Sequence, residues 1–190
     1  MGGINLSRRA LLKSALFGAG AVAVGGAGVA VASAVGRRLF GSEDAAIAEA
    51  WRLIEEEGAS RVIVRGGEIA AVAKGRGVRP ILALLETDGA ALEGAIVVDS
   101  VVGLPAAAVA VKGRAAKVLA RTASEPARDF LTRSGVPLEA KVVVPNILNR
   151  DLTGVCPLEA SLVALNGAGP DALVAQAYAT LDGLRRRPVA

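Results

Sequence analysis

The stretch GAIVVDSVVGLPAAAVAVK, residues 94–112, decides the fold class of this 190-residue chain. It opens with the fully apolar run Ala95–Val98, which is typical of a strand buried on both faces of a sheet. An alanine-rich segment from about Val101 to Lys112 follows and favours a helix. A buried strand that leads directly into a helix predicts a crossover connection, and crossovers join parallel strands.

The same alternation continues towards the C-terminus. Two further apolar strands are predicted over Lys117–Ala120 and Lys141–Val144. Between them, a capping serine and a first-turn proline open a helix at Ser124. Prolines also mark the starts of two later helices, at Pro157 and Pro170. Repeated strand–helix units predict a mainly parallel sheet with helices on both faces.

The N-terminal side of this pattern is a hairpin. Strands are predicted over Arg61–Arg65 and Glu68–Ala73, and the glycine pair between them supplies a two-residue turn. Ser42 can cap a preceding helix that runs from about Glu43 to Glu57. The sequence therefore predicts an α/β domain over residues 43–190, with a five-stranded mixed sheet whose N-terminal hairpin is antiparallel.

The first 34 residues resemble a twin-arginine (Tat) export signal. The stretch SRRALLK, residues 7–13, matches the S-R-R-x-x-L-K form of that signal, with Arg8 and Arg9 as the paired arginines. An uncharged run from Ala15 to Val35 follows, close to the ~20 apolar residues that cross a bilayer. The resemblance implies that the twin-arginine translocation machinery carries the folded protein out of the cytoplasm, to the periplasm, the cell envelope or the exterior.

The end of this segment resembles a cleavage site. Ala32 and Ala34 form an A-x-A pattern, which predicts cleavage after Ala34, and residues 35–42 then form a linker. The alternative is that the segment stays attached as an N-terminal membrane anchor. In either case we expect contact with the membrane only through this segment.

Charge and composition exclude several function classes. Residues 35–190 carry 19 basic and 18 acidic side chains, because three of the 22 basic residues and none of the acidic ones precede them. A net charge of +1 and an aromatic content of 3% argue against nucleic-acid binding, which needs a basic surface with interleaved aromatic residues. The single cysteine allows no intramolecular disulfide. No cofactor is expected, because ligands for haem, iron–sulfur clusters or structural zinc are not visible.

The predicted order of elements resembles the cytidine deaminase-like three-layer fold. Within that fold, the residues from about Trp51 to Leu165 resemble the family of domains of unknown function numbered 1893. The matching stretches are VRGGEI (64–69), GRGVRP (75–80), GAIVVDSVVG (94–103), SEPA (124–127) and NRDLTGVCPLE (149–159). That family usually has a lysine after the glycine of its strand-to-helix turn. Here Leu104 and Pro105 follow Gly103, so no role for that lysine carries over.

The same resemblance decides one mechanistic question. Active deaminases of this fold bind zinc through a His or Cys near a glutamate and through two cysteines at the start of the next helix. This chain has no histidine and one cysteine, and SEPA stands where the cysteine pair is expected. We therefore expect no metal site, and hydrolytic zinc deamination is excluded.

The resemblance also implies that two helix N-termini converge on one pocket, and free N–H groups at such ends suit phosphate or carboxylate groups. The candidate ligand-binding residues at these ends are Asp99, Ser100, Ser124 and Glu125. Asp99 could accept hydrogen bonds from a ribose or a base, and the alternative is a helix cap. Ser124 has the same alternative, and Glu125 could instead favour the helix dipole.

The loop from Asn146 to Cys156 concentrates polar residues in a chain rich in alanine and valine. Loops that a rigid scaffold positions often carry binding residues. The candidates here are Asn149, Arg150, Asp151, Thr153 and Cys156. Arg150 could hold an anionic group through two hydrogen bonds. The alternatives are a loop that satisfies its own backbone and a cysteine that acts as a small buried apolar side chain.

Two functions follow from these patterns. The first is an exported, metal-free domain that binds a small nucleotide-like or other anionic ligand. The second is a non-catalytic, homo-oligomeric or protein-interaction module of the cell envelope. No catalytic residue can be assigned from spacing.

Overall fold

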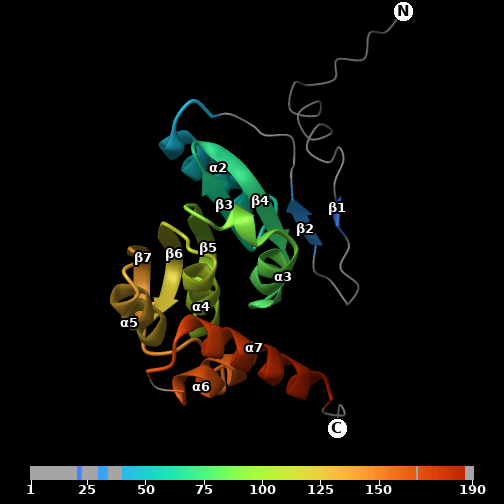
Figure 1. Cartoon of the computed structure of the whole chain (residues 1–190), viewed down its shortest axis with the longest axis vertical. Helices are drawn as coiled ribbons and strands as arrows, with labels where there is room; N and C mark the ends of the chain where they lie inside the picture. The colour runs from blue at the N-terminus through green and yellow to red at the C-terminus, as the bar shows by residue number, and fades with distance from the viewer. Residues whose placement is uncertain (1–20, 23–29, 34–39, 166, 187–190) are drawn as a thin grey trace, which may run out of the picture.

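The computed structural model describes residues 21–22, 30–33, 40–165 and 167–186. A central mixed sheet separates one helix on one face from five helices on the other, and α6 and α7 pack together below α4 (Figure 1).

The hairpin forms as predicted. Strand β3, Arg61–Arg65, turns into β4, Glu68–Lys74, through Gly66 and Gly67. Both glycines have positive φ angles, 58° and 75°, which a two-residue hairpin turn of this type requires. The register shifts by one residue between Ile63 and Val64.

The other three strands of the domain run parallel to one another. They are β5, Ile96–Val102; β6, Lys117–Ser124; and β7, Leu138–Val144. Strand β3 pairs antiparallel with β5, so the domain has the order β4-β3-β5-β6-β7. The five-stranded mixed sheet with an N-terminal antiparallel hairpin is therefore confirmed.

Two short strands extend the sheet beyond the predicted five. Strand β2, Ala30–Ser33, pairs antiparallel with β4, and β1, Ala21–Val22, pairs with β2. Both strands lie within the segment that resembles an export signal. Arg8, Arg9 and Ala34 of that segment lie outside the described residues.

Of the described helices, α2, Glu43–Glu56, is the one that covers its face of the sheet. Its cap is the predicted one, since the Ser42 hydroxyl accepts a hydrogen bond from the N–H of Ala45 at 3.2 Å. Ala46, Ala50, Leu53 and Ile54 of this helix pack on apolar side chains of β3, β4, β5 and β6. This four-residue stripe at helical spacing explains why the helix docks here.

The opposite face carries the larger core. Five helices contribute to it: α3, Arg79–Asp88; α4, Leu104–Lys112; α5, Glu125–Arg133; α6, Pro157–Val163; and α7, Pro170–Arg185. A 3-10 turn, Gly89–Ala91, links α3 to the sheet. Helix α4 lies at the centre of this layer, and nearly all of its residues are buried.

Strands β5 and β6 end later than their apolar runs suggest. Pairing of Val101 with Thr122 and of Val102 with Ala123 carries both strands on by four residues. The expectation of a helix from Val101 is therefore wrong, because backbone bonding to β6 continues there. Asp99 and Ser100 lie within β5, and α4 begins at Leu104.

Within the part of the chain that the structure describes, no helix is both long enough and apolar enough to cross a membrane.

Candidate functional site

A cavity of about 370 Å³ opens where β5 ends and α4 begins. Four parts of the chain line it: the start of β3, the loop after β4, the second half of β5 with the first turn of α4, and the segment that leads into α6. In open α/β sheets, ligands bind at the carboxyl ends of the parallel strands, and this cavity lies at such an end.

An ion pair between two neighbouring strands forms part of the cavity wall. Arg61 of β3 and Asp99 of β5 are cross-strand partners, and the arginine Nε lies 2.9 Å from the aspartate Oδ2. Both side chains are buried, with exposed fractions of 3% and 2%. Burial raises the pKa of Asp99, while the Arg61 guanidinium and the backbone N–H groups of Val101 and Ser100 lower it.

One nitrogen of the Arg61 guanidinium has no hydrogen-bond partner among the described residues. Its Nη2 donates to the carbonyl oxygen of Gly77 at 2.9 Å, which ties the loop after β4 to the start of β3. Its Nη1 is buried and has no hydrogen-bond partner. A buried donor without a partner is costly, so a small movement of this side chain that lets Nη1 meet an acceptor atom of a ligand in the cavity would be favourable.

Glu159 of α6 is the third buried charged residue of the cavity, at 1% exposure. Its Oε2 accepts a hydrogen bond from the N–H of Leu104 at 2.8 Å, so this carboxyl group caps α4. Its Oε1 is buried and accepts no hydrogen bond of standard geometry from the described residues. Burial raises the pKa of Glu159, and contacts with the Ser124 hydroxyl and the N–H groups of Leu104 and Ile147 lower it.

Gly103 makes room for that carboxyl group. A Cβ atom at this position would lie 2.5 Å from Glu159 Oε2 and 3.1 Å from Ile147 Cγ1. The glycine between β5 and α4 is therefore a packing requirement of the cap.

Three predicted site residues line the cavity: Asp99, Ser100 and Cys156. Ser124 lies beside it, fully buried, where its hydroxyl accepts from the N–H of Ala127 at 3.2 Å and contacts Glu159. Glu125, in the first turn of α5, is exposed and does not line the cavity.

The other predicted residues lie at the tip of a small hairpin. Leu148 and Val155 form an antiparallel bridge, which brings the flanking Ile147 and Cys156 to the cavity. The Asn149 side chain accepts from the N–H of Thr153 at 2.9 Å and closes the tip on itself. Arg150, Asp151 and Thr153 are exposed on this tip and lie outside the cavity lining.

Sequence reasoning missed two residues of the site. Arg61 carried a signal, because it is a charged residue at the first position of an otherwise apolar strand. Glu159 ends the stretch 149–159 that resembles the family, but its role was not predictable, because it depends on α6 folding back onto α4, 55 residues earlier in the chain.

The residues present do not fit a zinc site. The whole chain has no histidine and one cysteine, and the described residues contain no group of three or more His, Cys, Asp or Glu side chains close enough to hold a metal ion.

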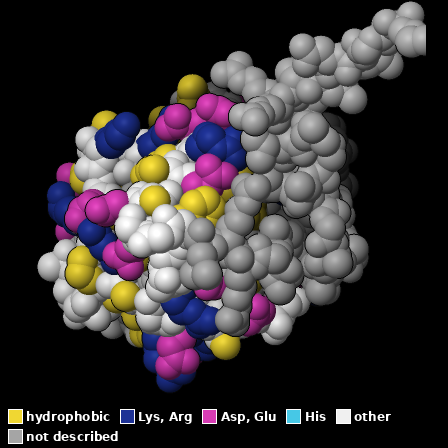
Figure 2. Space-filling view, turned by 90° about the horizontal axis from the view of Figure 1, so that it is seen from above, with side chains coloured by type: hydrophobic (Ala, Val, Ile, Leu, Met, Phe, Trp, Pro, Cys, Tyr) yellow, Lys and Arg dark blue, Asp and Glu magenta, His cyan; other side chains and the backbone are white. Residues whose placement is uncertain are grey.

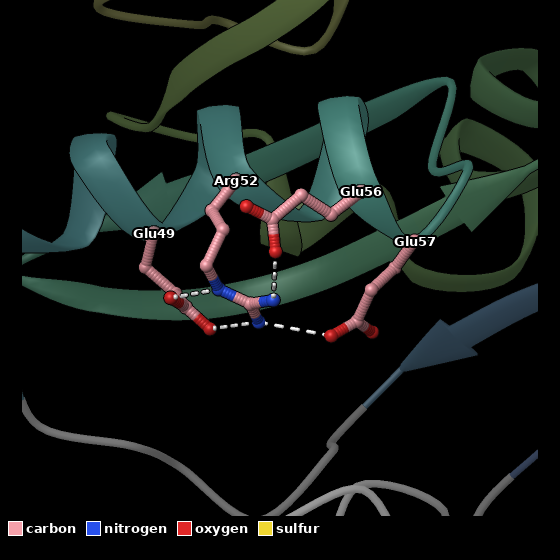
Figure 3. Close-up of polar contacts among 4 residues, drawn as sticks. All are labelled: Glu49, Arg52, Glu56 and Glu57. Carbon is pink, nitrogen blue, oxygen red and sulfur yellow. Dashed lines mark hydrogen bonds and ion pairs between the residues drawn. The ribbon is translucent and has the colours of Figure 1, made fainter. Parts of the chain in front are cut away.

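The surface charges are mixed in sign. Figure 2 shows basic and acidic side chains side by side, with no continuous basic area on the described part of the visible face. A second charged group lies on α2, away from the cavity, where Arg52 contacts Glu49, Glu56 and Glu57 (Figure 3).

Comparisons with known proteins agree with this fold. A crystal structure of a DUF1893 family protein from Thermotoga maritima is 23% identical, with a TM-score of 0.64, and the match covers 75% of this chain and 94% of that chain. At that identity the likeness establishes the fold alone. No curated protein matches the sequence. The sequence profile of TM1506, a domain of unknown function (DUF1893), matches residues 49–171, which is well over half of the chain. The chain therefore belongs to the DUF1893 family.

Proposed function

We propose that this domain binds a small nucleotide-like or other anionic ligand in the cavity at Arg61 and is not a zinc deaminase. The observation that carries the proposal is the Arg61 guanidinium, which is buried in the cavity wall with Nη1 unpaired. An acceptor atom of a ligand would satisfy this donor. The volume of about 370 Å³ falls in the range of small-molecule sites.

A second cation supports the proposal. Arg76, between Gly75 and Gly77, lines the cavity and is exposed at its mouth. Among the described residues it has no ion-pair partner. Two arginines at one cavity, one in its wall and one at its entrance, suit a ligand with acceptor or anionic groups.

Titration calorimetry of the full chain with nucleotides, nucleosides and sugar phosphates tests this proposal. We expect saturable binding that Arg76→Ala weakens without lowering the melting temperature, because the Arg76 side chain is exposed and forms no ion pair with the described residues. Arg128→Ala is the matched control, since Arg128 is an exposed arginine on α5 outside the cavity lining. A chain that binds nothing in the panel, or equal weakening by both variants, contradicts the proposal.

We also propose that the twin-arginine pathway exports the domain and that cleavage after Ala34 releases it. The supporting observation is the SRRALLK stretch ahead of an uncharged run. Replacing Arg8 and Arg9 together with lysine should retain the protein in the cytoplasm in a fractionation assay. Replacing Arg37 and Arg38 with lysine is the matched control. Normal export of the variant with lysine at positions 8 and 9 would contradict this proposal.

The exposed apolar side chains at the end of β7 and in the loop after it favour a second candidate, a homo-oligomeric module. The stretch 142–155 exposes Val142, Val143, Leu148, Leu152 and Val155. Strand β7 is the last of the described strands of the sheet, and its outer edge pairs with none of them, so it can pair with β7 of a second copy. An antiparallel register centred on Ala140 places Glu139 opposite Lys141 and Leu138 opposite Val142, so charges and apolar groups match.

Light scattering after size exclusion tests this pairing. Lys141→Glu should dissociate the dimer, because it places like charges opposite each other. Adding Glu139→Lys should restore it. Because Glu139 also pairs with Lys117 within the chain, Lys117→Ala is the control for that lost contact. A monomeric wild-type chain at all concentrations rules out this candidate.

A further inference from the structure

The cavity interior carries no excess positive charge. Its buried ionisable side chains are one arginine and two carboxyl groups, Arg61, Asp99 and Glu159. Asp99 already balances the charge of Arg61 at 2.9 Å. A bare anion placed deep in the cavity would therefore meet a neutral pair and a second carboxyl group, and burying it there would be unfavourable.

The residues of the interior instead leave one donor and one carboxyl oxygen without hydrogen-bond partners among the described residues. Arg61 Nη1 and Glu159 Oε1 are both buried without hydrogen-bond partners, while the other polar ends of these side chains are held by Gly77 and Leu104. A donor and an acceptor in one cavity are complementary to a neutral group that presents an acceptor and an N–H or O–H donor. Amides, ureas and heterocyclic bases have this pattern.

The mouth of the cavity has the opposite character. Arg76 is exposed there and is flanked by Gly75 and Gly77, whose φ angles are 121° and 68°. Flanking glycines leave the backbone open to close approach by a ligand. An anionic group at this position would keep part of its hydration and would face a cation without an ion-pair partner among the described residues.

We infer that the cavity takes a bipolar ligand, with a neutral donor–acceptor head against Arg61 and Glu159 and an anionic tail at the mouth beside Arg76. This inference rests on the proposed binding function and narrows it. Nucleoside monophosphates and amide-bearing carboxylates fit the description. Inorganic phosphate and simple sugar phosphates do not, because they lack the head.

Calorimetric titration of the full chain with matched probes tests the inference. The probes are four nucleosides, their 5′-monophosphates, ribose 5-phosphate and inorganic phosphate. We expect at least one monophosphate to bind about tenfold more tightly than its nucleoside, which corresponds to about 1.4 kcal/mol. Ribose 5-phosphate and phosphate should bind far more weakly than either.

Variants separate the two ends. Arg76→Ala should reduce the affinity for the monophosphate to that for the nucleoside and leave the nucleoside affinity unchanged. Glu159→Gln should alter the preference among nucleosides and leave the ratio of monophosphate to nucleoside affinity unchanged, because the tail lies elsewhere. Before titration, Arg76→Ala is checked for an unchanged melting transition and Glu159→Gln for a single cooperative one.

The outcomes separate this inference from the proposed function. Phosphate or ribose 5-phosphate that binds as tightly as the monophosphates overturns the bipolar ligand and leaves anion binding intact. An Arg76→Ala variant that weakens nucleosides and monophosphates equally also overturns it. Failure of every probe to bind overturns the proposed function itself.

Discussion

The carboxyl group of Glu159 is buried, and its burial predicts how the stability of the protein changes with pH. Burial raises its pKa above the ordinary value of 4.5, so the folded chain holds this proton more tightly than the unfolded chain. Where the folded state binds more protons, the free energy of unfolding falls as pH rises. The free energy of unfolding therefore falls as pH rises from the unfolded to the folded pKa of Glu159. Above the folded pKa the loss is complete and stays constant.

We expect Glu159→Gln to remove that dependence. The glutamine oxygen can still accept from the N–H of Leu104, so the cap on α4 is retained. In urea unfolding between pH 4 and pH 8, the variant should gain stability relative to the wild type as pH rises. Asp99 is present in both proteins, so its own titration cancels in the difference. A difference that stays constant with pH contradicts this account.

Gly103 gives a second prediction about the same cap. In Gly103→Ala, the new Cβ would lie only 2.5 Å from Glu159 Oε2. The carboxyl group would have to move away, and Ile147 would be disturbed as well. Overpacking of this kind costs about 1–3 kcal/mol of unfolding free energy. Gly154→Ala is the matched control, because nothing lies within 4 Å of a Cβ at that position. Equal stability of the two variants in chemical denaturation would show that α6 does not fix this carboxyl group.

Individual residues differ in how well the sequence predicted them. Asp99, Ser100 and Cys156 were recognisable because each is polar or reactive beside an apolar element, and all three line the cavity. Their surroundings were not predictable, since Asp99 pairs with an arginine 38 positions earlier through strand pairing. Glu159 acts through a fold-level contact, and no local pattern indicates one.

Helix α2 carries a group of ion pairs in which one guanidinium, that of Arg52, binds several carboxylates. Arg52 Nε and Nη2 lie 2.8 Å and 2.7 Å from the two carboxylate oxygens of Glu49, and Nη2 also lies 2.9 Å from Glu57 (Figure 3). Glu56 completes the group at 3.5 Å. These carboxylates raise the pKa of Arg52 further above its ordinary value, so it stays charged.

Arg52→Ala should lower the unfolding free energy by about 1 kcal/mol, because partly exposed pairs are each worth a fraction of that and the glutamates then repel one another. Arg52→Lys should recover less than half of this loss, since an ammonium group cannot bind two carboxylates in a fork. The deficit should shrink in high salt. Guanidinium chloride is itself a salt, so the measurement is urea unfolding. A lysine variant as stable as the wild type contradicts the account.

Boundaries of secondary-structure elements were predicted well where a local signal marks them and poorly where strand pairing sets them. Strand β3 and the glycine turn match their predicted positions, because positive φ at two adjacent glycines is a local property. Strands β5 and β6 each run four residues past their apolar segments. Their length depends on hydrogen bonding between the two strands, which neither segment reveals by itself.

The molecule as a whole is organised around two apolar clusters on opposite faces of one sheet. Every buried member of both clusters lies between Ala46 and Ala177. The alternation of apolar strands and helices predicted this arrangement, because strands that are apolar on both faces must be covered on both. The addition of β1 and β2 at the sheet edge was not predictable, since that segment matches an export signal instead.

A chain that begins at residue 35 should therefore fold without its N-terminal segment. It keeps both clusters and loses the four residue pairs between β2 and β4, which leaves β4 as an open edge. We expect one cooperative unfolding transition, with a denaturant slope within about 15% of that of the full chain, because the surface exposed on unfolding is nearly the same.

A chain that begins at residue 60 is the control. It lacks α2 and exposes the apolar face that Ala46, Ala50, Leu53 and Ile54 cover, so it should not unfold cooperatively. Loss of cooperativity in the longer of the two chains would mean that the edge pairing, and not the two clusters, holds the domain together.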